Sequence, residues 1–501
     1  MNINVLEYLE KTAADYPERL VYRDEKDSIT FGRLLELSRR AGSLLSKKID
    51  PRKPVLVVAE KNLMTPVMYY GVLYAGAYYV PVSRDLPAYR INLIIKTVGA
   101  SLMLAGEEDM EFVSGLDFDG EVVTAPELIC ADTDKAALDA VRSRAMDTDP
   151  AYVIFTSGST GVPKGVIESH RQLIDYIEAF TEAFDLGPDE IYGNQSPLDY
   201  IAAIRDLYIP LKTGAQTVFI PKKYFSIPAA LFDYINEHRV STICWVVGAL
   251  VLCSEFRVFD SKKLETVKKV IFTGSVMPCR HLRVWQDNLP DALFVNHYGP
   301  TEITASCTYY VVDHPVQDDE TLPIGVPFRN TGIILLDENG REAEYGEQGE
   351  ICVRGTSISL GYYRNPEKTK EAFIVNPAND VYEEIIYATG DIGRYMPDGN
   401  LEFLGRKDHQ IKHMGHRVEL GEIEAAVLAM PETGEAVCMY NKEKQQIWLF
   451  YSGETDQKAI GRHLREILPA FMVPRKYKKL DVLPKSFNGK INLTELRSMM
   501  E

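Results

Sequence analysis

Apolar and polar positions along the first 300 residues alternate between helix-like and strand-like stretches. Apolar residues recur at helical spacing over 5–15 and again over 31–45. Uninterrupted apolar runs at 54–59 and 78–82 are typical of buried strands, and a helical stretch, 64–76, lies between them. Similar short runs return at 151–155, 216–220, 270–272 and 293–295. This alternation predicts an α/β fold, with parallel sheets covered by helices.

The pattern changes at about residue 325, where short strands and glycine turns replace the long helices. Examples are the segments 332–336, 350–354 and 400–404, which together predict a small β-rich subdomain. After residue 407 about 94 residues remain, enough for a small α+β domain. We therefore expect an N-terminal body of two parallel-sheet-and-helix subdomains plus the β-rich subdomain at 1–407, and a small mobile C-terminal domain at 408–501.

Composition narrows the class of protein. With 55 Lys and Arg against 72 Asp and Glu, the net charge is −17, which argues against nucleic acid or an anionic membrane as a partner. The most apolar window spans only 243–253, about half of a bilayer span, and residues 1–4 lack the basic start of a secretion signal. Seven scattered cysteines without a Cys-x-x-Cys pair favour a reducing compartment over disulfides or a zinc site. We expect a soluble, cytoplasmic protein.

A glycine- and hydroxyl-rich loop follows the apolar run at 151–155. It reads Thr156-Ser157-Gly158-Ser159-Thr160-Gly161 and ends at Lys164. Glycines let backbone N–H groups approach an anion closely, hydroxyls add hydrogen bonds, and a lysine adds positive charge. The loop therefore predicts a phosphate site, although it matches neither the Walker nor the dinucleotide pattern. The alternative is a flexible surface loop.

Six further segments share an order and spacing with this loop. They are Leu-Tyr-Ala-Gly-Ala-Tyr-Tyr-Val-Pro-Val at 73–82, Asn-His-Tyr-Gly-Pro-Thr-Glu at 296–302, Gly-Glu-Ile-Cys-Val-Arg-Gly at 349–355 with Gly361-Tyr362, Tyr-Ala-Thr-Gly-Asp at 387–391, Gly-Arg-Lys-Asp-His-Gln-Ile-Lys at 405–412, and Asn-Gly-Lys at 488–490. Together these segments resemble the adenylate-forming superfamily of acyl-CoA synthetases, luciferases and nonribosomal-peptide adenylation domains. Within it, the chain is most similar to a stand-alone adenylation enzyme of the nonribosomal-peptide type.

The resemblance implies activation of a carboxylic acid by ATP and Mg²⁺, with an acyl adenylate formed and pyrophosphate released. It assigns Tyr298 to stacking on adenine, Asp391 to the ribose, and Glu302 to Mg²⁺, a hard cation suited to carboxylate oxygen. It assigns catalysis to Lys490, Glu302 and Thr301. The nucleotide set that it implies is Thr156, Ser157, Gly158, Ser159, Thr160, Gly161, Lys164, Gly274, Asn296, Tyr298, Gly299, Asp391 and Arg406.

Each of these residues also has an ordinary structural interpretation. Tyr298 would pack in a core, and Glu302 would be a helix N-terminal charge stabilised by the helix dipole. Asp391 would lie in a turn, and Lys490 would be an exposed turn lysine. The resemblance further places a hinge at Asp408, about which the C-terminal domain rotates after adenylation. Residues 414–417 would then approach the incoming thiol. The alternative is a rigid linker.

The expected acyl pocket departs from the pattern of relatives that activate α-amino acids. In those relatives an aspartate pairs with the buried ammonium, and an ungapped alignment puts Ile201 at that position. The same alignment lines the pocket with Tyr200, Ile201, Ala202, Arg205, Trp245, Ile271, Thr273, His297, Ala305 and Ser306. Arg205 would repel an ammonium, so we expect an aryl, α-keto, α-hydroxy or dicarboxylic acid. Two alternatives stay open: Arg205 pairs with Asp206 and points away, or a two-residue slip puts Asp199 in the ammonium position.

The activated acyl group needs an acceptor. We expect a separate phosphopantetheinyl carrier protein, with coenzyme A as the alternative. A basic cluster, Arg475-Lys476-Tyr477-Lys478-Lys479, would steer an acidic carrier or be plain solvated surface. Other functions left open are an amino-acid-activating ligase (including a D-alanine-type carrier-protein ligase), an amide ligase, and a nonenzymatic nucleotide-binding protein.

Overall fold

Two large sheets form the body of the molecule, and the computed structural model describes residues 2–158, 162–407, 410–442, 444–485 and 491–500. The first sheet has the order β6-β5-β3-β4-β7-β8, in which only the β7–β8 pair is antiparallel. Its strands are β3 (Pro54–Val58), β4 (Tyr78–Val82), β5 (Leu102–Ala105), β6 (Glu121–Thr124), β7 (Pro150–Thr156) and β8 (Lys164–Ser169). Helices around it are α1 (Leu6–Asp15), α2 (Phe31–Leu45), α3 (Met64–Tyr74), α4 (Ala88–Val98), α5 (Met110–Ser114), α6 (Ala125–Cys130) and α7 (Lys135–Arg142), with η1 at Glu107–Asp109.

The second sheet has nine strands in the order β15-β14-β13-β12-β11-β9-β10-β1-β2. The run from β13 to β1 is parallel, and antiparallel strands close both edges. Its strands are β1 (Leu20–Arg23), β2 (Ser28–Thr30), β9 (Ile191–Asn194), β10 (Gln216–Phe219), β11 (Thr242–Val246), β12 (Lys269–Thr273), β13 (Leu293–Tyr298), β14 (Thr308–Val312) and β15 (Val326–Pro327). Its helices are α8 (His170–Ala183), α9 (Ala203–Thr213), α10 (Pro228–Glu237), α11 (Val247–Glu255) and α12 (Cys279–Asn288), with η2 (Lys222–Ser226), η3 (Val258–Asp260) and η4 (Thr301–Ile303).

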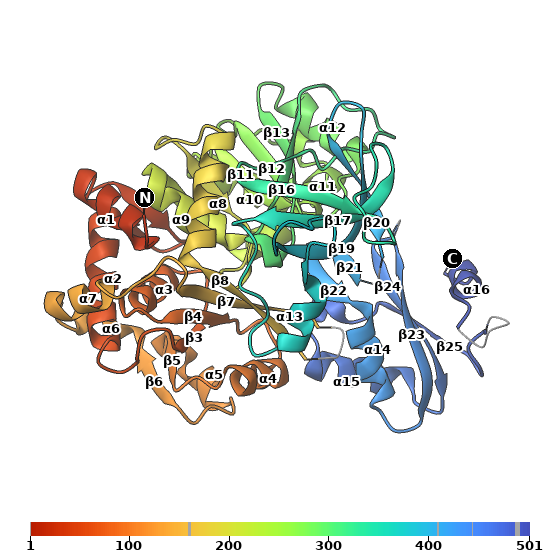
Figure 1. Cartoon of the computed structure of the whole chain (residues 1–501), viewed down its shortest axis with the longest axis horizontal. Helices are drawn as coiled ribbons and strands as arrows, with labels where there is room; N and C mark the ends of the chain where they lie inside the picture. The colour runs from red at the N-terminus through yellow and green to blue at the C-terminus, as the bar shows by residue number, and fades with distance from the viewer. Residues whose placement is uncertain (1, 159–161, 408–409, 443, 486–490, 501) are drawn as a thin grey trace.

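A smaller antiparallel sheet follows, drawn in teal in Figure 1. It consists of β16 (Thr331–Leu336), β17 (Gln348–Gly355), β18 (Phe373–Val375), β19 (Ile385–Tyr395) and β20 (Leu401–Arg406), with helix α13 at Pro366–Ala372. The predicted β-rich subdomain and the α/β fold class are therefore confirmed. Helices and strands predicted from the apolar pattern, such as α2 and β4, begin and end at the expected residues.

The C-terminal part, in blue, lies at the opposite end of the long axis from α1 (Figure 1). It has a hairpin of β21 (Gln410–His413) and β22 (His416–Glu419), then α14 (Leu420–Leu428), β23 (Thr433–Asn441), β24 (Gln446–Gly453), α15 (Gln457–Ile467), η5 (Ala470–Met472), β25 (Lys476–Lys479) and α16 (Leu493–Ser498). The C-terminal part has a separate buried apolar cluster, which includes Val418, Ile423 and Leu449. The expected boundary at residue 408 falls outside the described residues and stays a prediction. No helix among the described residues is long and apolar enough to cross a membrane.

Strands β11, β12 and β13 have apolar cores on both faces, because alternate side chains of a strand point to opposite sides. Cys244, Ile271 and Val295 join one buried cluster. Their sequence neighbours, including Trp245 and Phe272, join another. Only the first of these clusters contains Ile201 and Ala305, so the face that carries Cys244 is the one that matters for the candidate site.

Candidate functional site

The glycine-rich loop connects two paired strands, so its ends are fixed close together. Thr156 at the end of β7 pairs with Lys164 at the start of β8, and the Thr156 hydroxyl donates to the Lys164 carbonyl over 3.4 Å. A side chain at position 158 would stand 2.1 Å from the Val162 carbonyl oxygen, so only glycine fits there. Three residues predicted for phosphate binding, Ser159, Thr160 and Gly161, lie outside the described residues.

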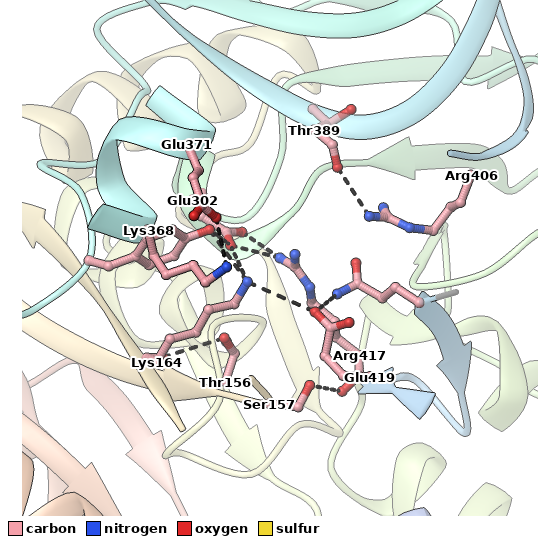
Figure 2. Close-up of polar contacts among 12 residues, drawn as sticks. Thr156, Ser157, Lys164, Glu302, Lys368, Glu371, Thr389, Arg406, Arg417 and Glu419 are labelled. Carbon is pink, nitrogen blue, oxygen red and sulfur yellow. Dashed lines mark hydrogen bonds and ion pairs between the residues drawn. The ribbon is translucent and has the colours of Figure 1, made fainter. Parts of the chain in front are cut away.

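Glu302 lies beside this loop in η4 and is fully buried. Nη1 of Arg417 donates to both carboxylate oxygens over 2.7 Å, the Tyr362 hydroxyl donates to one of them over 2.7 Å, and Nζ of Lys164 is 3.8 Å away (Figure 2). Burial alone would raise the pKa of Glu302, but Arg417 and Lys164 lower it to about 2. Burial and Arg417 lower the pKa of Lys164 to about 8. The carboxylate is therefore held ionised among cations.

A second polar group forms around Asp391 on β19. The Tyr298 hydroxyl donates to one oxygen of Asp391, and Arg406 of the paired strand β20 donates to the other. Arg406 also donates to the Thr389 carbonyl oxygen over 3.2 Å (Figure 2). Nζ of Lys412 lies 5.4 Å from the centroid of the Tyr298 ring. The sequence predicts that Tyr298, Asp391 and Arg406 share the nucleotide site, and the structure brings the three into contact.

Other predicted nucleotide residues shape the backbone between the two groups. The Asn296 side chain donates to the Pro323 carbonyl oxygen over 2.7 Å. A side chain at Gly299 would meet the Ser306 backbone at 2.3 Å, and Gly274 has a φ of 95°. Thr301 is buried at the start of η4. Lys490 and the hinge residue Asp408 lie outside the described residues, so their roles stay predictions.

The predicted acyl-pocket residues meet on the Cys244 face of the nine-stranded sheet. Ile201, Ile271 and Ala305 share one apolar cluster, and Ala202 and Thr273 are buried at its margin. Arg205 and His297 are each 2% exposed. Nε and Nη2 of Arg205 and both ring nitrogens of His297 have no hydrogen-bond partner among the described residues. Buried polar atoms normally have partners, so these four nitrogens mark a place for a ligand group.

Among the predicted pocket residues, Arg205 carries the positive charge. Burial and the neighbouring Arg205 lower the pKa of His297 well below its usual value, so its imidazole is neutral. Burial opposes the charge of Arg205, but Cys244, Tyr176 and Asp206 raise its pKa overall. The Tyr176 hydroxyl lies 3.3 Å from the hydroxyl of Ser306, another predicted pocket residue. The pocket therefore offers one permanent cation and several hydrogen-bonding groups.

Trp245 does not join this set, and its assignment to the pocket is corrected. Its side chain lies on the opposite face of the sheet, where Nε1 donates to the Gly193 carbonyl oxygen over 2.7 Å and the ring packs edge-on to Phe225. Because side chains alternate along a strand, Cys244 and not Trp245 lies on the face that carries Ile201, Ile271 and Ala305.

The sequence left two alternatives open: an ion pair between Arg205 and Asp206, and Asp199 in the ammonium-pairing position. Asp206 accepts a hydrogen bond of 2.6 Å from Asn194, and the described residues show no ion pair between Asp206 and Arg205. Burial, with Asp85 and Glu60, raises the pKa of Asp199 to about 7. The groups that influence Asp199 are not those of the Arg205–His297 pocket.

Sequence reasoning missed several residues of the site. Strand alternation was the signal for Cys244, and Tyr362 belongs to one of the sequence motifs but had no role assigned to it. Tyr176 on α8 lies 130 residues from Ser306, and Glu419 on β22 lies more than 100 residues from Lys164, so no local signal marks these contacts. Arg417 was expected near the thiol, and its contact with Glu302 was not foreseen.

Comparison with known proteins identifies the family. A family model described as "AMP-binding enzyme" matches residues 9–363. The chain belongs to this family. It is 30% identical over 500 residues to tyrocidine synthase 1 of Brevibacillus parabrevis, covering 98% of this chain and 44% of the relative. It is 29% identical over 494 residues to gramicidin S synthase 1 of Brevibacillus brevis, covering 97% of this chain and 44% of that relative. The chain thus spans under half the length of these curated relatives.

Solved structures agree with this family. The crystal structure of IdnL1 matches with a TM-score of 0.83 at 25% identity, over 96% of this chain and 99% of that one. An artificially fused adenylation–PCP di-domain protein, NpsA-ThdA from Klebsiella oxytoca, shares the fold with a TM-score of 0.81 at 21% identity. The match covers 100% of this chain and 97% of that one. The predicted resemblance is confirmed: the chain is a member of the AMP-binding enzyme family, and it shares the fold of these solved structures.

Proposed function

We propose that this AMP-binding enzyme uses ATP to activate a carboxylic acid that lacks an ordinary α-amino group, and then transfers the acyl group to the thiol of a phosphopantetheinyl carrier protein. The observation that supports the substrate class is that Nε and Nη2 of Arg205 and both ring nitrogens of His297 are buried without a hydrogen-bond partner among the described residues. The reaction class rests on the family and on the two polar groups around Glu302 and Asp391.

The first half-reaction joins two anions, so the site must neutralise charge and align the reactants. A carboxylate oxygen of the acid attacks the α-phosphorus of ATP, the bond to the bridging oxygen breaks, and pyrophosphate leaves. Asp391, Tyr298 and Arg406 would hold the adenosine. The loop hydroxyls and Lys164 would hold the outgoing phosphates, and Lys490 would bridge the carboxylate and the α-phosphate.

Glu302 fits a Mg²⁺ site. The described residues contain no cluster of three or more His, Cys, Asp or Glu that could hold a metal alone. Magnesium commonly uses one or two carboxylates and completes its shell with phosphate oxygens and water, so the ionised Glu302 is sufficient beside a triphosphate. The ion would neutralise phosphate charge there. Thr301 would keep the Glu302 backbone in place.

The substrate class follows from the buried charge. An ammonium in this pocket would face Arg205, and under the ungapped alignment that puts Ile201 at the pairing position it would lack a carboxylate partner. A keto, hydroxyl or second carboxylate group would instead satisfy the free nitrogens of Arg205 and His297. Tyr176 and Ser306 add hydroxyls, while Ile201, Ile271 and Cys244, which share one buried cluster, would contact the apolar body of the acid.

In the second half-reaction the acceptor's sulfur attacks the acyl carbon, the bond to AMP breaks, and the thiol proton is lost. A carrier acceptor is supported by the solved adenylation–PCP di-domain protein that shares the fold and by the exposed basic cluster of Arg475, Lys476 and Lys479 on and beside β25. Such a cluster favours an acidic partner. Thioester formed on coenzyme A and on no carrier protein would contradict this choice.

The substrate proposal is tested by pyrophosphate exchange with a panel of amino, aryl, keto, hydroxy and dicarboxylic acids. We expect faster pyrophosphate exchange with the keto, hydroxy, aryl or dicarboxylic acids than with the amino acids. For the best acid, Arg205→Gln should lower kcat/KM by about 100-fold, since a charge-assisted pair in a dry pocket is lost. Asp199→Asn serves as the matched variant and should leave exchange within about twofold. Turnover of amino acids that disappears in Asp199→Asn and survives in Arg205→Gln would contradict the proposal.

A further inference from the structure

Two nitrogens on one edge of the Arg205 guanidinium group await a ligand. Nε and Nη2 are both buried without a hydrogen-bond partner among the described residues. These two nitrogens carry the parallel N–H groups with which an arginine binds both oxygens of one carboxylate. The side chain is on helix α9 and is 2% exposed, so this edge faces the interior of the protein rather than solvent.

The charge of Arg205 also lacks a directly paired anion. Among the described residues, no Asp or Glu forms an ion pair or a hydrogen bond with it. The neighbouring Asp206 instead accepts a hydrogen bond of 2.6 Å from Asn194. Burial raises the pKa of Asp206 to about 6, although Arg205, Asn194 and Lys61 each lower it, so its charge is shared with a second cation. A buried guanidinium without its own carboxylate is costly, and a ligand that carries one removes that cost.

His297 adds neutral hydrogen-bonding atoms near Arg205. Both of its ring nitrogens are buried without a partner among the described residues, and burial, together with Arg205, lowers its pKa well below the usual value. The ring packs edge-on against Phe180 and Phe328, with centroid distances of 5.4 Å and 5.5 Å, which fixes its orientation. A neutral imidazole has one N–H and one acceptor nitrogen. His297 therefore adds a hydrogen bond, but no charge, to the group that Arg205 binds.

These atoms discriminate among the four classes of acid in the proposed function. A keto or hydroxyl oxygen would accept a hydrogen bond, but it would leave the buried charge of Arg205 without a counter-charge. An unsubstituted aryl ring offers no oxygen to the free N–H groups. A second carboxylate offers two oxygens to the Nε–Nη2 edge and also balances its charge. Of the four classes, the dicarboxylic acids alone satisfy both the geometry and the charge.

We infer that the substrate is a dicarboxylic acid whose second carboxylate binds the Nε–Nη2 edge of Arg205 and accepts a further hydrogen bond from His297. The inference rests on the proposed function for the identity of the acyl pocket. One carboxylate of the substrate attacks ATP, while the second does not react and holds the far end of the molecule. Arg205 is then the residue that selects acids with a second carboxylate over neutral acids of the same shape.

Matched acids test this on the unmodified chain. Pyrophosphate exchange is measured with glutarate, adipate and isophthalate, each beside its monoamide and its methyl ketone, which keep the shape of the diacid and lose the charge. For at least one diacid we expect kcat/KM to exceed that of both neutral analogues by about 100-fold. Faster exchange with a keto, hydroxy or aryl acid than with every dicarboxylic acid would overturn the inference and leave the proposed function in place. Faster exchange with α-amino acids would contradict both.

Two substitutions of Arg205 separate its charge from its geometry. Arg205→Lys keeps the positive charge and loses the two-nitrogen edge, so it should lower kcat/KM for the best diacid about tenfold while the diacid stays preferred over its monoamide. Arg205→Gln removes both features and should bring the diacid and its monoamide within about threefold of each other.

Arg84→Gln is the control for these variants, because Arg84 pairs with Glu60 and Asp109 and its side chain is 43% exposed. It should show the same acid preference as the unmodified chain, and thermal unfolding shows that each variant is folded. A preference for the diacid over its monoamide that persists undiminished in Arg205→Gln would overturn the inference, since another group would then bind the second carboxylate.

Discussion

At the scale of single residues, one position on β11 separates a pocket residue from a core residue. Cys244 faces Arg205 and raises its pKa, while Trp245, the next residue, donates a hydrogen bond to Gly193 on the other side of the sheet. The ungapped alignment with relatives that activate α-amino acids suggested Trp245. Strand geometry decides in favour of Cys244.

Substitutions at these two positions should affect different properties: catalytic activity for Cys244 and stability for Trp245. Cys244→Val adds volume on the pocket face and should lower kcat/KM for the preferred acid about tenfold, with little change in stability. Trp245→Phe leaves the Gly193 carbonyl oxygen buried without its donor, which should cost about 1–3 kcal/mol of stability and leave the order of preferred acids unchanged. Pyrophosphate exchange and thermal unfolding measure the two effects, and a changed acid preference in Trp245→Phe would contradict the geometry.

At the scale of elements, the start of α8 shows how helices are joined in the body. Ser169 caps the helix together with Gln172. The next residue, His170, is buried, and its Nδ1 accepts a hydrogen bond of 3.4 Å from the backbone N–H of Val5, just before α1. Only a neutral imidazole can accept there, and a positive charge at a helix N-terminus is unfavourable. Burial lowers the pKa of His170 from 6.5 to about 4.

This contact predicts a pH dependence of stability. The folded pKa lies below the unfolded value, so the contribution of His170 is complete above about pH 6.5 and is lost as the pH falls toward 4. Between about pH 6.5 and pH 5 the loss should be about 2 kcal/mol, at roughly 1.4 kcal/mol per unit. Urea unfolding of the unmodified chain and of His170→Gln at both pH values measures it. Equal pH slopes for the two proteins would show that His170 is not the group responsible.

At the scale of the whole molecule, the C-terminal part contacts the body through β22 and the start of α14, where Glu422 forms an ion pair with Arg90 of α4. These two residues are 332 positions apart in the chain. The arrangement presents Arg417, and the backbone of Gly415 beside Tyr200, to the site.

The two half-reactions should depend differently on Arg90. Removing its charge leaves Glu422 buried without its partner, which destabilises this contact and leaves the ATP site intact. Arg90→Gln should slow acyl transfer to the thiol about tenfold while pyrophosphate exchange stays at or above its original rate. The two rates are measured separately, with preformed acyl adenylate for the transfer step. An equal fall in both would contradict a role for Arg90 in this contact alone.

The amino-acid sequence by itself determined which segments become strands and helices, because apolar periodicity is a local property. It also determined the family, through short segments such as 156–164 and 296–302 whose residue types follow from phosphate chemistry. Only the tertiary structure decided which face of β11 lines the predicted pocket and that Arg417 reaches Glu302. It also decided that Nε and Nη2 of Arg205 and both ring nitrogens of His297 are buried without a hydrogen-bond partner among the described residues. These facts depend on strand register and on contacts between segments far apart in the chain, and neither leaves a local trace in the order of residues.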